Sequence, residues 1–111
     1  MIIARRNLLK LIMAAPAAMI GIHETANAAD THTVRINGFA FMPERLQAKE
    51  GDKIIFVNED IVPHTATATD ESWDTGSLDT GEGAEIILSA DMTMDYYCRF
   101  HPMMKAVIEP Q

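Results

Sequence analysis

The chain contains a series of short strand-like runs separated by turn-forming clusters, and this pattern limits the fold more than any other feature. Lys53–Val57 is the strongest run, because branched and aromatic residues fill it and turn-forming residues bound it on both sides. No segment shows sustained helical periodicity. We therefore predict an all-β fold, an antiparallel sandwich or barrel. The other expected strands are Thr33–Ile36, Arg45–Ala48, His64–Thr69, Glu85–Leu88, Tyr96–Cys98 and Lys105–Ile108.

The first 28 residues have the three parts of a secretory signal peptide. A basic head with Arg5 and Arg6 precedes a short apolar run and a small-residue ending, Ala26-Asn27-Ala28. The apolar run falls short of the roughly 20 residues that a membrane-spanning helix needs. The adjacent arginines favour the twin-arginine export route. We predict a signal peptide at 1–28, one mature domain at 29–111, and export to the periplasm without stable membrane insertion after cleavage.

The composition excludes several classes of protein. The chain has 111 residues, 9 Lys and Arg, 16 Asp and Glu, a formal net charge of −7 and one cysteine. Nucleic-acid binding needs clustered basic residues, which this acidic chain lacks. One cysteine excludes an intramolecular disulfide and any site built from four thiolates. A mature domain of this size is near the limit at which a core alone suffices, so that a bound metal would help to stabilise it.

The strongest chemical signal is Cys98-x-x-His101-x-x-Met104, in which a thiolate, an imidazole and a thioether follow one another at two-residue gaps. A loop between two strands can direct all three side chains toward one ion. Two imidazoles, one thiolate and a distant methionine define a trigonal copper site for electron transfer. His64 is the best candidate for the second imidazole, because it follows Pro63 at an expected strand start, 34 positions before Cys98. Singly, each residue is more often an ordinary core or surface residue, so the prediction rests on their combination.

Further segments match those of a known family. They are Ile36–Pro43, Gly51–Lys53, Val57–Asp60, Val62–Thr65 and Tyr97–Met104. Through them the chain, from about Thr31 to Glu109, resembles the small cupredoxins of the amicyanin, pseudoazurin and plastocyanin group. The two-residue gaps on both sides of His101 are most similar to amicyanin. The resemblance implies a Greek-key β-sandwich.

The resemblance also implies roles for individual residues. His64, Cys98 and His101 correspond to the equatorial copper ligands and Met104 to the axial ligand, whereas Met103 matches a position that is not a ligand. One edge of His101 is expected to reach the surface within an apolar patch. The candidate members of that patch are Pro63, Phe100, Pro102 and Met103.

These features predict a periplasmic type 1 (blue) copper protein that shuttles single electrons between redox proteins and is not an enzyme. One copper per chain would cycle between Cu(I) and Cu(II), with all four ligand positions filled by protein. Removal of residues 1–28 takes away three basic residues and one acid, so that the net charge becomes −9. This charge favours a partner with a basic surface, such as a c-type cytochrome or a periplasmic dehydrogenase or reductase. We expect a monomer.

Two other functions use the same sequence features differently. A periplasmic copper chaperone or storage protein would use the same ligands to pass on the ion. A purely structural sandwich would bury Cys98 as an apolar filler.

The remaining polar residues are expected to be ordinary surface groups. His32, near the mature N-terminus, is expected to be solvated in preference to forming an auxiliary copper site. Five loop acids are expected to be solvated charges in preference to a surface that steers a basic partner. These acids are Asp70, Glu71, Asp74, Asp79 and Glu82.

Overall fold

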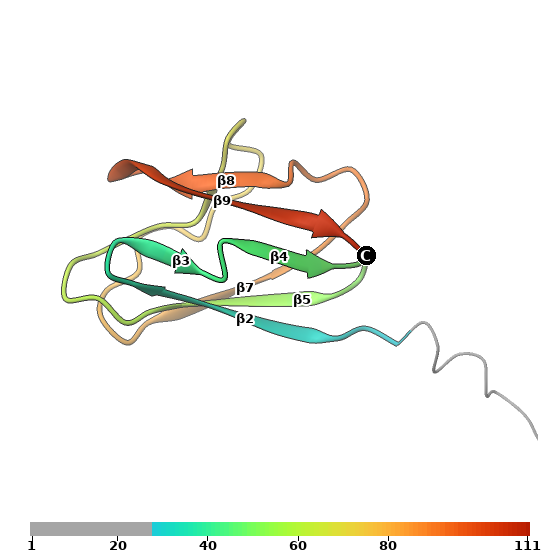
Figure 1. Ribbon diagram of the computed structural model, residues 1–111, viewed down its shortest axis with the longest axis horizontal. Helices are drawn as coiled ribbons and strands as arrows, with labels where there is room; N and C mark the ends of the chain where they lie inside the picture. The colour runs from blue at the N-terminus through green and yellow to red at the C-terminus, as the bar shows by residue number, and fades with distance from the viewer. Residues whose placement is uncertain (1–27) are drawn as a thin grey trace, which may run out of the picture.

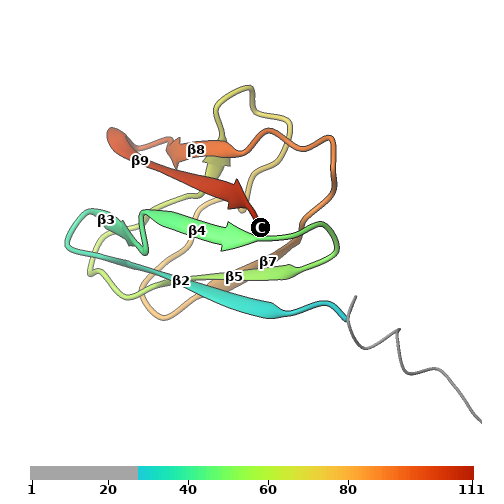
Figure 2. The same ribbon diagram turned by 45° about the vertical axis from the view of Figure 1, so that its right-hand side comes forward.

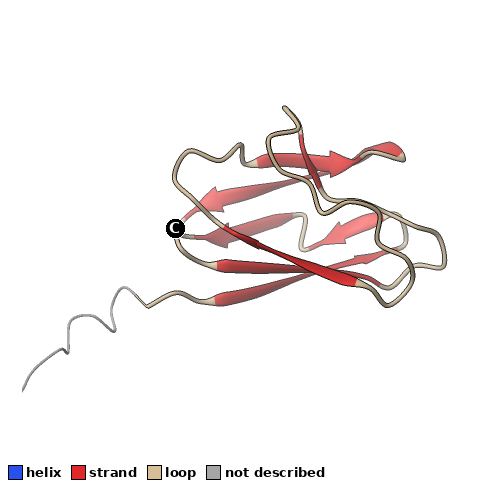
Figure 3. Cartoon of the chain, turned by 180° about the vertical axis from the view of Figure 1, so that it is seen from behind, coloured by secondary structure: helices blue, strands red, loops and turns tan. Residues whose placement is uncertain are grey.

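The structure is a computed structural model that describes residues 28–111, so that the predicted signal peptide lies almost entirely outside the described residues. Figure 3 shows strands and loops throughout this part of the chain, in agreement with the predicted all-β fold. Between residues 28 and 111, no helix is long and apolar enough to cross a membrane.

Eight strands within the described part of the chain form two four-stranded sheets that lie in two layers (Figure 1). The first sheet contains β3 (Ala40–Met42), β2 (Thr31–Asn37), β5 (Lys53–Asn58) and β7 (Gly83–Ile87), in that order. The second sheet contains β4 (Arg45–Ala48), β9 (His101–Pro110), β8 (Asp95–Cys98) and β6 (Thr67–Ala68), in that order. This arrangement confirms the predicted β-sandwich.

Two strand pairings are parallel, which departs from the antiparallel arrangement that we expected. β2 pairs with β5 and β4 with β9 in parallel, whereas the other four pairings of the described strands are antiparallel. A parallel pair needs a crossover connection. The β3–β4 segment provides one between β2 and β5, because β4 leaves the first sheet and joins the second.

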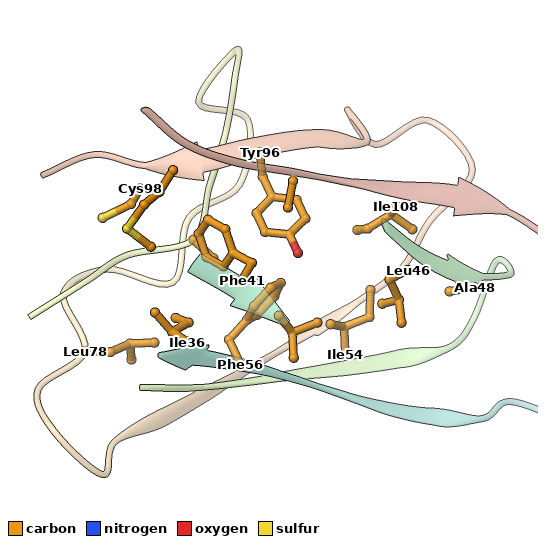
Figure 4. Packing of buried hydrophobic residues seen from close by; sticks show 14 of the residues in the cluster. Ile36, Phe41, Leu46, Ala48, Ile54, Phe56, Leu78, Tyr96, Cys98 and Ile108 are labelled. Carbon is orange, nitrogen blue, oxygen red and sulfur yellow. The ribbon is translucent and has the colours of Figure 1, made fainter. Parts of the chain in front are cut away.

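The hydrophobic core lies between the two sheets and follows the two-residue period of the strands. In β5, every second side chain is buried. Figure 4 shows core side chains of the two sheets pointing toward one another, with Cys98 toward one end and Ala48 toward the other. Tyr96 lies centrally and meets Phe56 edge-on, with ring centroids 5.4 Å apart. The thiol of Cys98 is therefore part of the core and not of the surface.

Most predicted strands are present, with differences at their ends and two larger exceptions. β4 matches its predicted bounds, and β9 extends beyond them in both directions. β3 was not predicted, because three residues between the turn at Gly38-Phe39 and Pro43 are too few to show a pattern. The strand predicted at His64–Thr69 is largely irregular, since only β6 forms within it and His64 makes an isolated bridge to Leu78.

Candidate metal centre

β8 and β9 form a tight hairpin at one end of the sandwich (Figure 2), and Cys98 and His101 are paired across it. β8 and β9 run antiparallel and are joined by only Arg99 and Phe100, so that Cys98 pairs directly with His101. Directly paired residues place their side chains on the same face, with Cβ atoms about 5 Å apart. Cys98 Sγ accordingly lies 3.7 Å from Nδ1 of His101. The two-residue gap in the sequence is thus the length of the turn.

An irregularity in β9 separates the two neighbouring methionines. Tyr97 pairs with Lys105, but the next residue of β8 pairs with His101, so that the three residues between His101 and Lys105 have no partner on β8. Met104 turns into the core and is 6% exposed, whereas Met103 is 91% exposed. Met104 is therefore buried, as a thioether ligand of an internal site would be, and Met103 extends into solvent.

His64 approaches the hairpin from the loop that follows β5. Its side chain is completely buried, and its backbone exchanges two hydrogen bonds with that of Leu78. Nδ1 of His64 lies 3.6 Å from Cys98 Sγ, and the ring centroids of His64 and His101 are 5.0 Å apart. The structure thus brings together three of the four residues that the sequence predicted as ligands, although His64 lies 34 positions before the cysteine.

The carboxylate of Asp60 fixes the orientation of the His64 ring. Asp60 Oδ2 accepts a hydrogen bond from Nε2 of His64 at 2.8 Å and another from the backbone N–H of Phe39 at 3.0 Å, while Oδ1 accepts one from Gly38. The N–H of Phe39 contributes most to lowering the pKa of Asp60, so that the carboxylate stays charged and can only accept hydrogen bonds. Nε2 must then carry the ring proton, which leaves the lone pair of Nδ1 facing the sulfur.

Our reading of the sequence missed Asp60. The available signal is an acid four positions before the predicted histidine ligand. That spacing alone does not distinguish it from the neighbouring Glu59, an exposed residue that pairs with Arg35.

Phe39 packs edge-on against both imidazole rings, with centroids 5.3 Å from His64 and 4.8 Å from His101. Its backbone has a φ of 60°, a conformation that bulky residues rarely adopt. Two hydrogen bonds from the Gly38-Phe39 turn to Asp60 stabilise this conformation. Phe39 is half exposed, as is Phe100, and Ile61 is 92% exposed.

The exposures beside His101 agree with the apolar patch that the sequence predicted. All four residues named from the sequence are exposed, and His101 itself is half-buried. Phe39 extends the patch, since it contacts His101 directly and exposes half of its surface.

The donor atoms fit a single metal ion. The ligand atoms of His64, Cys98 and His101 all lie within 4.8 Å of one another. A thiolate and an imidazole bound to one ion at roughly 2.3 and 2.0 Å in a trigonal arrangement are separated by about 3.7 Å. The two sulfur–nitrogen distances, 3.6 and 3.7 Å, match this separation. A soft thiolate with two imidazoles is a donor set suited to copper.

Several of the polar residues that we expected to be solvated take part in hydrogen bonds, and two of them, His32 and Asp74, join larger networks. His32 is partly buried and contacts Oδ2 of the buried Asp52 through Nε2 at 2.7 Å, and Lys49 contacts the same carboxylate. Asp74 accepts a hydrogen bond from Thr67 and pairs with Arg99. The expectation of a simple surface group is therefore wrong for His32, whereas Asp74 is exposed as expected but its carboxylate also anchors Thr67 and Arg99.

Comparison with known proteins agrees with a copper-binding donor set. The family model for copper binding proteins, plastocyanin/azurin family, matches residues 28–109. No curated protein matches the chain significantly.

Among solved structures, a Cu-containing nitrite reductase (NirK) from Thermus scotoductus SA-01 is similar, with 28% identity and a TM-score of 0.64. That match covers 73% of this chain but only 22% of the reductase. A purple cupredoxin from Nitrosopumilus maritimus is 22% identical with a TM-score of 0.64, over 72% of this chain and 99% of that one. Amicyanin from Paracoccus versutus is 22% identical with a TM-score of 0.63, over 76% and 84%. The last two likenesses concern the fold.

Proposed function

The chain belongs to the plastocyanin/azurin family of copper-binding proteins, and we propose that it is a periplasmic carrier of single electrons between redox proteins. The observation that carries this proposal is the approach of the Cys98 sulfur to the Nδ1 atoms of His64 and His101 at 3.6 and 3.7 Å. We further propose Met104 as the axial ligand, because it is the buried methionine of the pair beside this hairpin.

The donor set supports an electron carrier. Copper supplies a centre that takes up and releases one electron, and one thiolate, two imidazoles and a thioether suit both of its oxidation states. The protein holds its donors at the required separation through the β8–β9 hairpin, the bridge between His64 and Leu78, and the hydrogen bond to Asp60. Ligands that are already in place need little rearrangement when the charge of the ion changes.

The surface beside His101 supports contact with another protein. Phe39, Phe100 and Met103 expose apolar area next to a half-buried histidine, which shortens the path between the metal and a docked partner. The net charge of −9 of residues 29–111 as a whole favours a basic partner, such as a c-type cytochrome or a periplasmic dehydrogenase or reductase. Association should therefore weaken with salt.

We propose a carrier in preference to an enzyme. The four proposed ligands would fill the coordination positions of the ion, so that none is left for a substrate. Export rests on the signal peptide predicted at residues 1–28, and we propose that the domain acts as a monomer in the periplasm.

Spectroscopy of the copper-loaded domain tests this function. Residues 29–111 should show an intense visible thiolate-to-copper band that Cys98→Ala abolishes and His64→Ala abolishes or shifts. Met103→Ala is the matched control and should leave the band unchanged. Reversible redox cycling without release of copper to a chelator is expected of a carrier. Release on reduction would favour a chaperone, and a colourless protein that binds no copper would leave only a structural role.

A further inference from the structure

Thr65 joins the segment that carries His64 to the hairpin that carries Cys98. Its hydroxyl oxygen accepts a hydrogen bond from the backbone N–H of Arg99 at 2.8 Å. Its own backbone N–H points to Cys98 Sγ at 3.4 Å. Thr65 therefore contacts both the sulfur and the peptide group that immediately follows it.

The hydroxyl of Thr65 is the first member of a longer chain of hydrogen bonds. It lies 2.9 Å from the hydroxyl of Thr67, which donates to Oδ1 of Asp74 at 2.8 Å. Because Thr67 has only one hydroxyl proton and gives it to the carboxylate, Thr65 must donate to Thr67. The oxygen of Thr65 is then oriented to accept from Arg99, so that Asp74 sets the direction of every bond in the chain.

The chain closes on itself through the side chain of Arg99, whose guanidinium pairs with the other oxygen of Asp74. The N–H of Gly76 gives the carboxylate one more hydrogen bond, at 3.0 Å. Burial raises the pKa of Asp74, but these partners outweigh that effect and lower it, which favours the charged acceptor. Thr65 and Thr67 are almost completely buried, so that water does not compete for their hydroxyls.

We propose that Thr67 and Asp74 are positioning residues for the metal-binding thiolate, acting through the hydroxyl of Thr65 on the Cys98–Arg99 backbone. Neither residue supplies an atom to the proposed ligand set, and Asp74 lies 24 positions before Cys98. The inference rests on the proposed function in one respect, namely that Cys98 binds copper.

The effect on the metal follows from the hydrogen bond to sulfur. The N–H of Thr65 withdraws electron density from the thiolate, and such bonds tune the reduction potential of a copper–thiolate site. If Thr67 no longer fixes the Thr65 hydroxyl, the hydrogen bonds from the Thr65 N–H to sulfur and from the Arg99 N–H to Thr65 weaken. We expect the thiolate to donate more strongly and the reduction potential to fall.

The test compares Thr67→Val, which removes the hydroxyl at nearly constant shape, with Thr67→Ser, which keeps it. Thr69→Val is the matched control, because it makes the same change at an exposed position two residues along. Asp74→Ala tests the far end of the chain, with the exposed Asp79→Ala as its control. Two properties are measured: amide hydrogen exchange at Thr65 and Arg99 in the copper-free protein, and the visible band and reduction potential after copper loading.

In Thr67→Val and Asp74→Ala, exchange at these two amides should be about fivefold faster than in the controls, the factor expected from one ordinary hydrogen bond. The visible band should shift and the reduction potential should fall. Thr67→Ser, which keeps the hydroxyl, should retain the band and the potential of the parent protein. Exchange and potential equal to those of the controls would overturn the proposal. If Thr67→Val does not fold, Asp74→Ala decides the question. A colourless parent protein would refute the copper function, while the exchange data would still test the hydrogen-bond chain.

Discussion

Replacement of Asp60 with alanine is expected to weaken copper binding 10- to 100-fold, although Asp60 is not a proposed ligand. Asp60 Oδ2 accepts a hydrogen bond from Nε2 of His64, with 2.8 Å between the two atoms, and thereby directs Nδ1 toward the sulfur. Loss of an outer partner of a metal-binding histidine usually costs this factor in affinity. It corresponds to about 1.4–2.8 kcal/mol.

The same change should also destabilise the copper-free protein. Asp60 accepts two backbone hydrogen bonds from the turn at Gly38 and Phe39. Hydrogen bonds to a charged group contribute roughly 1.5–3 kcal/mol each, and solvent can replace part of that at this partly exposed turn. We therefore expect the free energy of unfolding to fall by about 1–3 kcal/mol. Asp60→Asn should be intermediate, because one amide oxygen cannot replace both carboxylate oxygens.

Competition with a Cu(I) chelator measures the affinity, and urea unfolding of the copper-free protein measures the stability. Asp79→Ala removes the same charge from an exposed loop and serves as the control for both. Copper affinity of Asp60→Ala within twofold of that control would refute the argument that the carboxylate orients His64. A loss of stability alone would show that Asp60 serves only the turn.

Three further changes test the core, the acid dependence and the methionine assignment. Met104→Ala should lower the free energy of unfolding by about 2–5 kcal/mol and alter the reduction potential, whereas Met103→Ala should cost less than about 0.5 kcal/mol and leave the potential unchanged. Burial raises the pKa of Asp52, but its hydrogen bonds outweigh burial and hold that pKa well below its usual range. The Asp52 carboxylate therefore stabilises the fold above about pH 4, and this contribution is lost as the pH falls toward its folded-state pKa. Asp52→Asn should be less stable at pH 7 and depend less on pH below 4, and parallel acid-unfolding curves would contradict this. The hydroxyl of Tyr96 is buried with no hydrogen-bond partner among the described residues, and Tyr96→Phe should raise thermal stability by about 1–2 kcal/mol. A lower melting temperature would show that the hydroxyl has a partner.

The strands were predictable where local pattern and fold agree, and neighbour relationships were not. The branched and aromatic residues of Lys53–Val57 favour an extended chain wherever it pairs. Alternation shows which face of a strand is buried but not which strand lies beside it, so that the parallel pairs β2–β5 and β4–β9 have no signal in the sequence. His64–Thr69 has the composition of a strand, yet the bridge to Leu78 and the approach to the hairpin impose an irregular path.

The site divides in the same way between local and distant information. Cys98 and His101 were predictable because a two-residue turn places them together, and the spacing is visible in the chain itself. Asp60 and Asp74 were not predictable, because their roles depend on partners more than 20 positions away in the sequence. These partners are the Gly38 turn for Asp60 and Arg99 for Asp74. In the sequence, both look like solvated loop acids.

The arrangement of these partners indicates that the protein shapes the site before any metal enters. The two segments that carry the proposed ligands are tied to one another or to the body of the sandwich by hydrogen bonds that need no ion. Asp60 holds the His64 ring, and Thr65 holds the β8–β9 hairpin. Without these hydrogen bonds, part of the binding free energy of the ion would be lost to the entropy of ordering the long chain between His64 and Cys98. Because the hydrogen bonds of Asp60 and Thr65 already offset much of that entropy, copper can bind tightly without reshaping its donors. The same fixed donors oppose rearrangement when the charge of the ion changes, which is the property that a carrier of single electrons requires.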